Sequence, residues 1–216
     1  MLVTALEMVN RFNAAHPWSH NDLYHRWVLR TLPERPRRTL NVGCGTGNLV
    51  RALAGRAGIA EGIDPDAAVI SIARELSTTH PTTRFDVRDL MAVTATGRYD
   101  AVTAIAVVHH LPLRAALRRM RALLAPGGTI VIVGCYHAHT RTDRLLDVVA
   151  IPANLIMGAL LSARAREASV AMRARTAPPE TTLAEVRAIA ADVLPGARIR
   201  RRLFWRYSLV YRAAPA

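Results

Sequence analysis

The sequence predicts an α/β fold: a doubly wound, mostly parallel, seven-stranded sheet with helices on both faces and an antiparallel hairpin at one edge. Two observations support this prediction. Between residues 39 and 134, short apolar runs alternate with segments of helical period, which is typical of parallel strands joined by crossover helices. Near the C-terminus, two expected strands, residues 198–205 and 207–212, are close enough in sequence to form an antiparallel hairpin.

The individual elements follow from apolar periodicity and from the residues that stop a helix. The expected strands are residues 39–42, 59–63, 83–87, 99–105, 129–134, 198–205 and 207–212. The expected helices are residues 2–13, 22–32, 48–56, 66–76, 113–124 and 181–194, with broken helical material over 141–175. Pro33 and Pro36 separate the second helix from the first strand. Residues 125–128, Ala-Pro-Gly-Gly, predict a sharp helix stop just before the fifth strand.

Length and cysteine content narrow the class of protein. A chain of 216 residues suits one domain with a substantial core. Cys44 and Cys135 provide neither a disulfide framework nor the spacing of a metal site, so no metal is expected. No signal-peptide pattern is evident, and the longest apolar stretch, residues 148–161, is too short to span a membrane. A cytoplasmic location is therefore expected.

The formal net charge of +13 comes entirely from arginine, because none of the 29 basic residues is lysine. Absence of lysine together with abundant alanine indicates GC-rich bacterial coding. The arginines cluster on the expected helix 113–124 and in the expected strand 198–205, where solvated faces are the simplest interpretation. Attraction to nucleic acid is the alternative.

The most informative motif is residues 40–47, Leu-Asn-Val-Gly-Cys-Gly-Thr-Gly, where an expected strand passes into a helix. Closely spaced glycines let the backbone turn tightly beneath a ligand, and the next helix offers unpaired N–H groups. A dinucleotide-binding fingerprint would require glycine at Asn48. A phosphate-binding P-loop would require a lysine, which the chain lacks.

This motif resembles motif I of class I S-adenosylmethionine (SAM)-dependent methyltransferases of the small-molecule type. Four later features resemble the same family in the same order: residues 62–66 (Gly-Ile-Asp-Pro-Asp), 88–90 (Arg-Asp-Leu), 99–111 and 124–128. The resemblance covers about residues 39–134 and implies a Rossmann-like methyltransferase fold. It also implies SAM as the methyl donor and S-adenosyl-L-homocysteine (SAH) as the product. The terminal hairpin is similar to the reversed edge hairpin of this family.

The resemblance implies a cofactor site at the following positions: Asn41, Gly43, Cys44, Gly45, Gly47, Asp64, Pro65, Asp89, Leu90, Ala104, Ile105 and Ala106. Asp64 would hold the ribose, since a carboxylate accepts hydrogen bonds from two vicinal hydroxyls. Asp66 is alternatively a helix cap. Asp89 and Leu90 would meet the adenine, and residues 104–106 would lie beside the sulfonium. Asn41 departs from the family, which often has an acidic residue there, so it brings no charge to the cofactor's ammonium.

The acceptor is expected at the carboxyl ends of the fourth and fifth strands, where ligands of open α/β sheets bind. His109 is the favoured catalytic base and His110 the second candidate, because imidazole titrates near neutral pH. A structural role for this pair is the alternative. Substrate contacts are expected from Trp18, His20, Tyr24, Tyr136 and His137, with His139 nearby. Trp18 and Tyr24 pack on the core in the competing interpretation.

The sequence thus predicts one methyltransferase domain over residues 1–216. Its expected parts are a helical cap (1–36), a SAM-binding core (37–134), a helical lid (135–180), and a C-terminal helix and hairpin (181–216). The expected acceptor is an oxygen or nitrogen atom of a small, partly hydrophobic metabolite, as in bacterial secondary metabolism.

Alternative functions stay open at this point. One is methylation of RNA or protein, favoured by the arginine excess, and the other is SAM binding without methyl transfer. Nucleic acid is disfavoured as a partner because no aromatic–basic stacking platform is evident. The apolar stretch 148–161 fits an acceptor pocket, a buried core helix, a dimer contact or peripheral membrane contact. A monomer and a homodimer are both compatible with the sequence.

Overall fold

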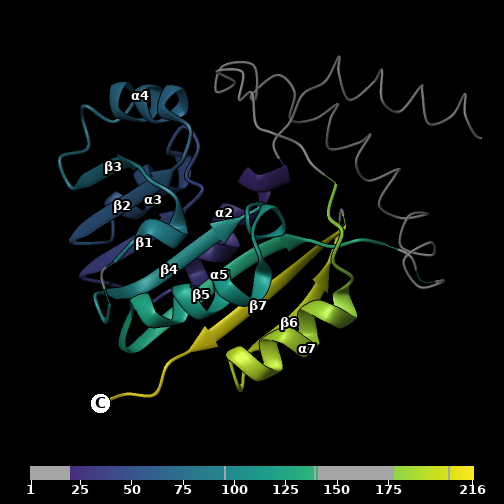
Figure 1. Ribbon diagram of the computed structural model, residues 1–216. Coiled ribbons are helices and arrows are strands. Elements are labelled where there is room, and N and C mark those ends of the chain that lie inside the picture. Colours follow the sequence, from purple (N-terminus) through teal and green to yellow (C-terminus); the bar gives the residue numbers. More distant parts are fainter. Residues whose placement is uncertain (1–19, 95, 139, 141–177, 204) are drawn as a thin grey trace, which may run out of the picture.

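Seven strands form one sheet, in the order β3-β2-β1-β4-β5-β7-β6, in the computed structural model of the protein (Figure 1). The structure describes residues 20–94, 96–138, 140, 178–203 and 205–216. The strands are β1 (Arg38–Val42), β2 (Ile59–Asp64), β3 (Thr83–Val87), β4 (Tyr99–Ile105), β5 (Leu124–Cys135), β6 (Arg198–Arg202) and β7 (Arg206–Arg212). Strands β1 to β5 are parallel, and β7 runs antiparallel to both β5 and β6. The predicted mostly parallel sheet with an antiparallel edge hairpin is confirmed.

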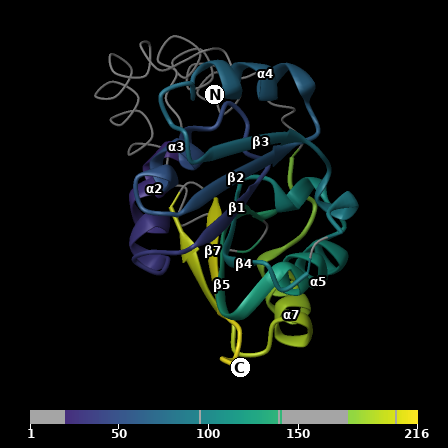
Figure 2. The same ribbon diagram turned by 90° about the vertical axis from the view of Figure 1, so that its left-hand side faces the viewer.

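Helices cover both faces of this sheet (Figure 2). On one face lie α2 (His20–Thr31), α3 (Asn48–Ala54) and α4 (Ala67–Glu75), and on the other lie α5 (Leu113–Leu123) and α7 (Leu183–Val193). Two short 3-10 helices, η1 (Leu90–Ala92) and η2 (Val108–His110), follow β3 and β4. Each face therefore has its own apolar core, which holds the strand ends in fixed positions.

The sequence of α5 explains why it packs as it does. Leu117, Met120 and Leu123 are completely buried and recur at helical spacing. Burying one such side chain stabilises the fold by roughly 1.5–3 kcal/mol. The arginines at 114, 118 and 121 are exposed, as a solvated helix face predicts. Arg114 forms an ion pair with Asp192 of α7, which joins the two helices of this face.

Two element boundaries differ from the prediction by more than two residues. Strand β5 begins at Leu124 rather than at residue 129, because Leu124 already pairs with Tyr99 and the register shifts before Ala101 pairs with Thr129. The expected turn at residues 125–128 is thus an irregularity inside the strand, with Gly127 at φ 73°. In the hairpin, β6 ends at Arg202 and β7 begins at Arg206, so the connection is longer than predicted.

Several expectations fall wholly or largely outside the described residues. These are the helix at 2–13, the helical material at 141–175, most of the cap and most of the lid. Within the described ranges, no helix is both long and apolar enough to cross a membrane.

Candidate functional site

The candidate site lies at the carboxyl ends of the parallel strands, where the strand order reverses. β1 has β2 on one side and β4 on the other, so the connections leave β1 and β4 in opposite directions along the sheet. Ligands of open α/β sheets bind at this kind of switch point. The glycine turn follows β1, Asp64 ends β2, and the segment containing His109 follows β4.

The glycine turn has a backbone that only glycine adopts without strain. Gly43, Gly45 and Gly47 have φ values of 63°, 51° and 84°. A Cβ on Gly43 would lie 2.2 Å from Val107 Cγ2, and a Cβ on Gly47 would lie 2.7 Å from the Phe85 ring. At Gly43 and Gly47 the backbone therefore packs directly against the Val107 and Phe85 side chains, and there is no room for a Cβ.

Asp64 is bonded to this turn. Its Oδ2 accepts a hydrogen bond from the Gly45 N–H at 3.1 Å, and its Oδ1 accepts one from the Asp66 N–H at 3.0 Å. Each carboxylate oxygen has a second acceptor position, and the side chain is only partly buried. Pro65 is exposed beside it. Asp64 is thus held in place with acceptor capacity left for a ligand.

Asp66 serves as the N-cap of α4. Its side chain accepts hydrogen bonds from the N–H groups of Ala68 (2.8 Å) and Val69 (3.4 Å). The capping interpretation of this residue is confirmed. The two acids of the Asp-Pro-Asp motif therefore have different structural roles, and only Asp64 contacts the glycine turn.

Asn41 and Cys44 are buried beneath the turn. Asn41 Oδ1 accepts a hydrogen bond from Thr103 Oγ1 at 3.1 Å, which ties β1 to β4 inside the core. Burial raises the pKa of the Cys44 thiol to about 12, and the charge of Asp64 adds to this shift. Cys44 is therefore a neutral packing residue.

The expected adenine and sulfonium residues occupy the ends of β3 and β4. Asp89 is exposed, and its carboxylate accepts a hydrogen bond from the Met91 N–H at 2.7 Å, while Leu90 is buried. Ala104 and Ile105 are buried at the end of β4. Ala106 follows with φ 55°, a strained value for a residue with a side chain, and its N–H donates to Val133 O at 2.8 Å. Contacts of these residues with a cofactor stay a prediction.

The two histidines stand side by side in η2. Their ring centroids are 3.9 Å apart. His110 is exposed, whereas His109 is partly buried, and its Nδ1 is buried without a hydrogen-bond partner in the described part of the chain. Burial lowers the pKa of His109 to about 4, with smaller contributions from His110 and Arg206. His109 is therefore neutral at physiological pH.

Two of the expected substrate residues, Tyr24 and Tyr136, contact the same segment, the connection between β6 and β7; the Tyr136 N–H donates to Trp205 O at 3.4 Å. Tyr24 is a core residue of α2 whose hydroxyl donates to Leu203 O at 2.9 Å, which agrees with the packing alternative. Tyr136 is buried just after β5, and His137 is exposed with its N–H donating to Thr181 O at 2.8 Å. Trp18 and His139 lie outside the described residues, and His20 is known only as the first residue of α2.

The structure also places Arg206 at the carboxyl end of β5, close to the candidate site. This residue was not identified from the sequence. Arg206 opposes Cys135 where β7 pairs with β5, and its Nη1 lies 2.9 Å from Cys135 Sγ. The only signal in the sequence was an arginine within the predicted hairpin. Nothing in the sequence states which residue of β5 such an arginine opposes.

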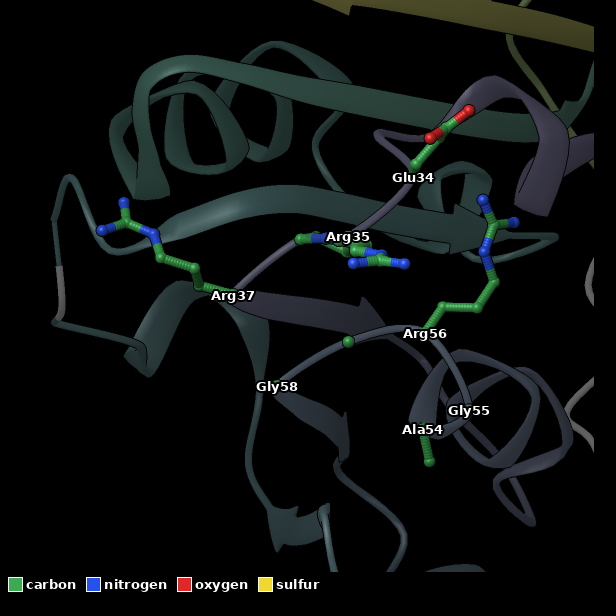
Figure 3. Close-up of a pocket in the computed structure, with 9 residues that line it drawn as sticks. Glu34, Arg35, Arg37, Ala54, Gly55, Arg56 and Gly58 are labelled. Carbon is green, nitrogen blue, oxygen red and sulfur yellow. The ribbon is translucent and has the colours of Figure 1, made fainter.

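A pocket of about 530 Å³ lies at the opposite, amino ends of β1 and β2 (Figure 3). It is lined by Glu34, Arg35, Pro36, Arg37, Ala54, Gly55, Arg56, Ala57 and Gly58. Arg56 Nη1 donates to Leu29 O at 2.5 Å, and Arg37 pairs with Asp100 at 3.3 Å. None of the predicted site residues lines this pocket. It is therefore separate from the candidate site.

Within the described ranges, no three His, Cys, Asp or Glu side chains gather in a way that would hold a metal ion.

Comparisons with known proteins agree with this geometry. A family model described as a methyltransferase domain matches residues 39–128. An uncharacterised methyltransferase of Mycobacterium tuberculosis (strain H37Rv) is 32% identical over 201 residues, which cover 91% of this chain and 98% of that protein. A ubiquinone biosynthesis O-methyltransferase of Stutzerimonas stutzeri is 30% identical over 115 residues, covering 51% of this chain and 49% of that protein. The N-methyltransferase NodS of Bradyrhizobium japonicum has a similar fold, with a TM-score of 0.57, 16% identity, and coverage of 89% of this chain and 96% of that chain.

Proposed function

The chain belongs to the class I SAM-dependent methyltransferase family, and on this premise we propose that it transfers the methyl group of SAM to an oxygen or nitrogen atom of a small, partly hydrophobic metabolite. The observation that supports this most directly is the bond between the glycine turn and Asp64. A tight turn of glycines with positive φ and a carboxylate held 3.1 Å from the Gly45 nitrogen together suit a ligand with an amino-acid end and a ribose.

The described residues fit this cofactor. The turn formed by the glycines at 43, 45 and 47 would hold the amino-acid end, and neither Gly43 nor Gly47 has room for a side chain. Asp64 would accept hydrogen bonds from the ribose hydroxyls, and Asp89 with Leu90 would hold the adenine. When bound, SAM supplies a methyl group on a positively charged sulfur, which is activated for in-line displacement. The protein then mainly has to align the acceptor, and such positioning supplies roughly 7–11 kcal/mol of the barrier.

His109 is the candidate proton acceptor. Its ring is neutral at pH 7 because its pKa is about 4, so a lone pair is available. The same low pKa makes it a weak base, since the best catalytic pKa lies near the working pH. Because His109 is a weak base, it best suits a substrate whose methyl-accepting atom loses its proton readily or carries no proton when it binds.

Calorimetric titration with SAH tests the cofactor assignment. We expect the wild-type protein to bind SAH and Asp64→Ala to bind it at least tenfold more weakly. Hydrogen bonds to a charged group contribute about 1.5–3 kcal/mol each, and tenfold corresponds to about 1.4 kcal/mol. Asp66→Asn is the matched control, because Asp66 caps α4 and does not contact the glycine turn. No heat from SAM or SAH in the wild-type protein would refute the proposal.

Turnover separates the proposed enzyme from a protein that only binds SAM. Transfer of a labelled methyl group should be measured against a panel of small O- and N-nucleophiles. Tight SAH binding with no turnover on any member of that panel would support the binding-only alternative.

The arginine-lined pocket favours RNA as a second candidate acceptor. Arg35, Arg37 and Arg56 line it together with Glu34. Because Arg37 pairs with Asp100, the attraction for a phosphate backbone comes mainly from Arg35 and Arg56. Methylation of one RNA sequence in preference to others would support this candidate. RNA binding that falls steeply with salt and shows no sequence preference would reflect backbone attraction alone.

A further inference from the structure

Arg206 stands on the acceptor side of the candidate site. It is the first residue of β7 and is opposite Cys135, the last residue of β5. The glycine turn follows β1, which is three strand positions away in the sheet order. At about 4.8 Å per strand, this separates the start of β7 from the end of β1 by about 14 Å. The arginine is thus remote from the expected amino-acid end of SAM and close to the expected position of the acceptor.

The guanidinium has unused hydrogen-bonding capacity. Its Nη1 lies 2.9 Å from Cys135 Sγ, whereas Nε is buried and has no partner among the described residues. Nε and Nη2 form one edge of the guanidinium, and this edge binds carboxylates through two parallel hydrogen bonds. Buried polar groups almost always have partners, and a ligand group bound at this edge would supply one to Nε.

The charge of Arg206 also lacks a counter-ion in the described part of the chain. The ion pairs found there involve Arg37, Arg38, Arg98 and Arg114. Cys135 does not supply a negative charge, because burial raises the pKa of its thiol more than Arg206 lowers it. A partly buried cation with a neutral sulfur as its neighbour favours an anionic ligand.

His109 lies within the influence of this charge. Besides burial and His110, the positive charge of Arg206 lowers the pKa of His109. The Nδ1 of His109 and the Nε of Arg206 are both buried and unpartnered in the described ranges. The His109 ring, which is the candidate proton acceptor, and the Arg206 guanidinium therefore lie at the same end of the sheet.

We propose that Arg206 binds a carboxylate group of the methyl acceptor, so that the acceptor is an acidic metabolite. This proposal rests on the proposed methyltransferase function and names the substrate class of that same site. Arg206 positions the acceptor through its anionic group, and Cys135 orients the guanidinium. A carboxylate beside His109 also offsets the charge of Arg206, which adds to the effect of burial in lowering the pKa of this ring.

Binding of small carboxylates to the SAH-saturated protein tests this proposal. The probes are a panel of aromatic and aliphatic carboxylates, each with its neutral primary amide as the matched compound, in calorimetric titrations. At least one carboxylate should bind with clear preference over its amide. Arg206→Gln should weaken that binding at least tenfold, and Arg206→Lys should restore part of it. Arg200→Gln is the control, because Arg200 is an exposed arginine of the same hairpin.

A second readout does not depend on affinity or turnover. Titration of the His109 ring by NMR, assigned with the His109→Gln variant, should show a pKa near 4 that rises in Arg206→Gln. It should also rise when a bound carboxylate compensates the arginine in the wild-type protein. Equal binding of carboxylates and amides across the panel would overturn the proposal, and so would carboxylate binding unaffected by Arg206→Gln. If the wild-type protein does not bind SAH at all, that result counts against the methyltransferase function. The carboxylate proposal is tested separately, because the carboxylate titration can also be run without SAH.

Discussion

Replacing Gly43 by alanine tests whether contact with the segment after β4 determines the shape of the cofactor turn. Gly43 has φ 63°, and an added Cβ would lie 2.2 Å and 2.8 Å from the two methyl groups of Val107. Gly97 offers a matched control. It has φ 59°, and nothing lies within 4 Å of an added Cβ. The two alanine variants therefore share the backbone strain, and only the Gly43 variant also overlaps a neighbour.

The expected magnitudes follow from these two effects. A left-handed backbone costs a residue with a Cβ roughly 1–2 kcal/mol, so Gly97→Ala should lower the free energy of unfolding by about that amount. Overpacking adds typically about 1–3 kcal/mol. Gly43→Ala should therefore lose about 2–5 kcal/mol in total. Because Val107 directly follows Ala106, its displacement moves the expected wall of the sulfonium pocket, and SAH affinity should fall at least tenfold.

Urea unfolding measures the stability of each variant, and calorimetry with SAH measures the affinity. The double variant Gly43→Ala/Val107→Ala removes both overlapping methyl groups and leaves the Val107 Cβ at 3.1 Å. It should be more stable than the sum of the two single substitutions predicts. Equal losses of stability in Gly43→Ala and Gly97→Ala, or no coupling in the double variant, would contradict an overlap with Val107.

Three further predictions follow from single contacts. Gly134→Ala should lower the free energy of unfolding by about 1–3 kcal/mol in urea, because its Cβ would fall 2.3 Å from the Tyr207 ring. His109 binds fewer protons in the folded than in the unfolded state between its folded pKa of about 4 and its ordinary 6.5, so stability should fall as pH drops through this window. His109→Gln should flatten that dependence in urea titrations at several pH values. Asn41→Asp should strengthen SAM binding by calorimetry and lower the melting temperature of the ligand-free protein, and a melting temperature that rises would contradict this.

The parallel half of the fold was readable from local patterns. The bounds predicted for β3 and β4 match the structure, because β3 alternates charged residues with Thr83, Phe85 and Val87, and β4 is a mostly apolar run. Local patterns failed where pairing partners decide the outcome. Residues 125–128 have the composition of a turn, yet Gly127 N–H donates to Ala214 O and Ala213 N–H donates to Gly128 O, each at 2.8 Å. Residues 213 and 214 thus continue the pairing of β7 with β5 along residues whose composition indicates a turn.

In the candidate site too, some residues could be predicted from local sequence and others could not. The glycine turn and Asp64 carry a recognisable spacing, because a tight turn and a carboxylate one strand away are both encoded locally. The contact between Arg206 and Cys135 joins residues 71 positions apart and depends on the register of an antiparallel pair. The hydroxyl of Tyr24 finds its partner, Leu203 O, 179 positions away. Such pairings follow from the assembled sheet, and no single segment specifies them.

The neutral residue at position 41 changes how cofactor binding has to be achieved. Asn41 is 4% exposed and its carbonyl oxygen bonds to Thr103, which is completely buried. A carboxylate at this depth would pay a large desolvation cost in the ligand-free protein, whereas an amide satisfied by a hydroxyl does not. The amide in turn gives up the charge attraction that an acid would offer the cofactor's ammonium. Cofactor affinity must then come mainly from the backbone of the glycine turn and from Asp64. For that reason, substitution of Asp64 should cost this protein more affinity than it costs a relative with an acid at the position of Asn41.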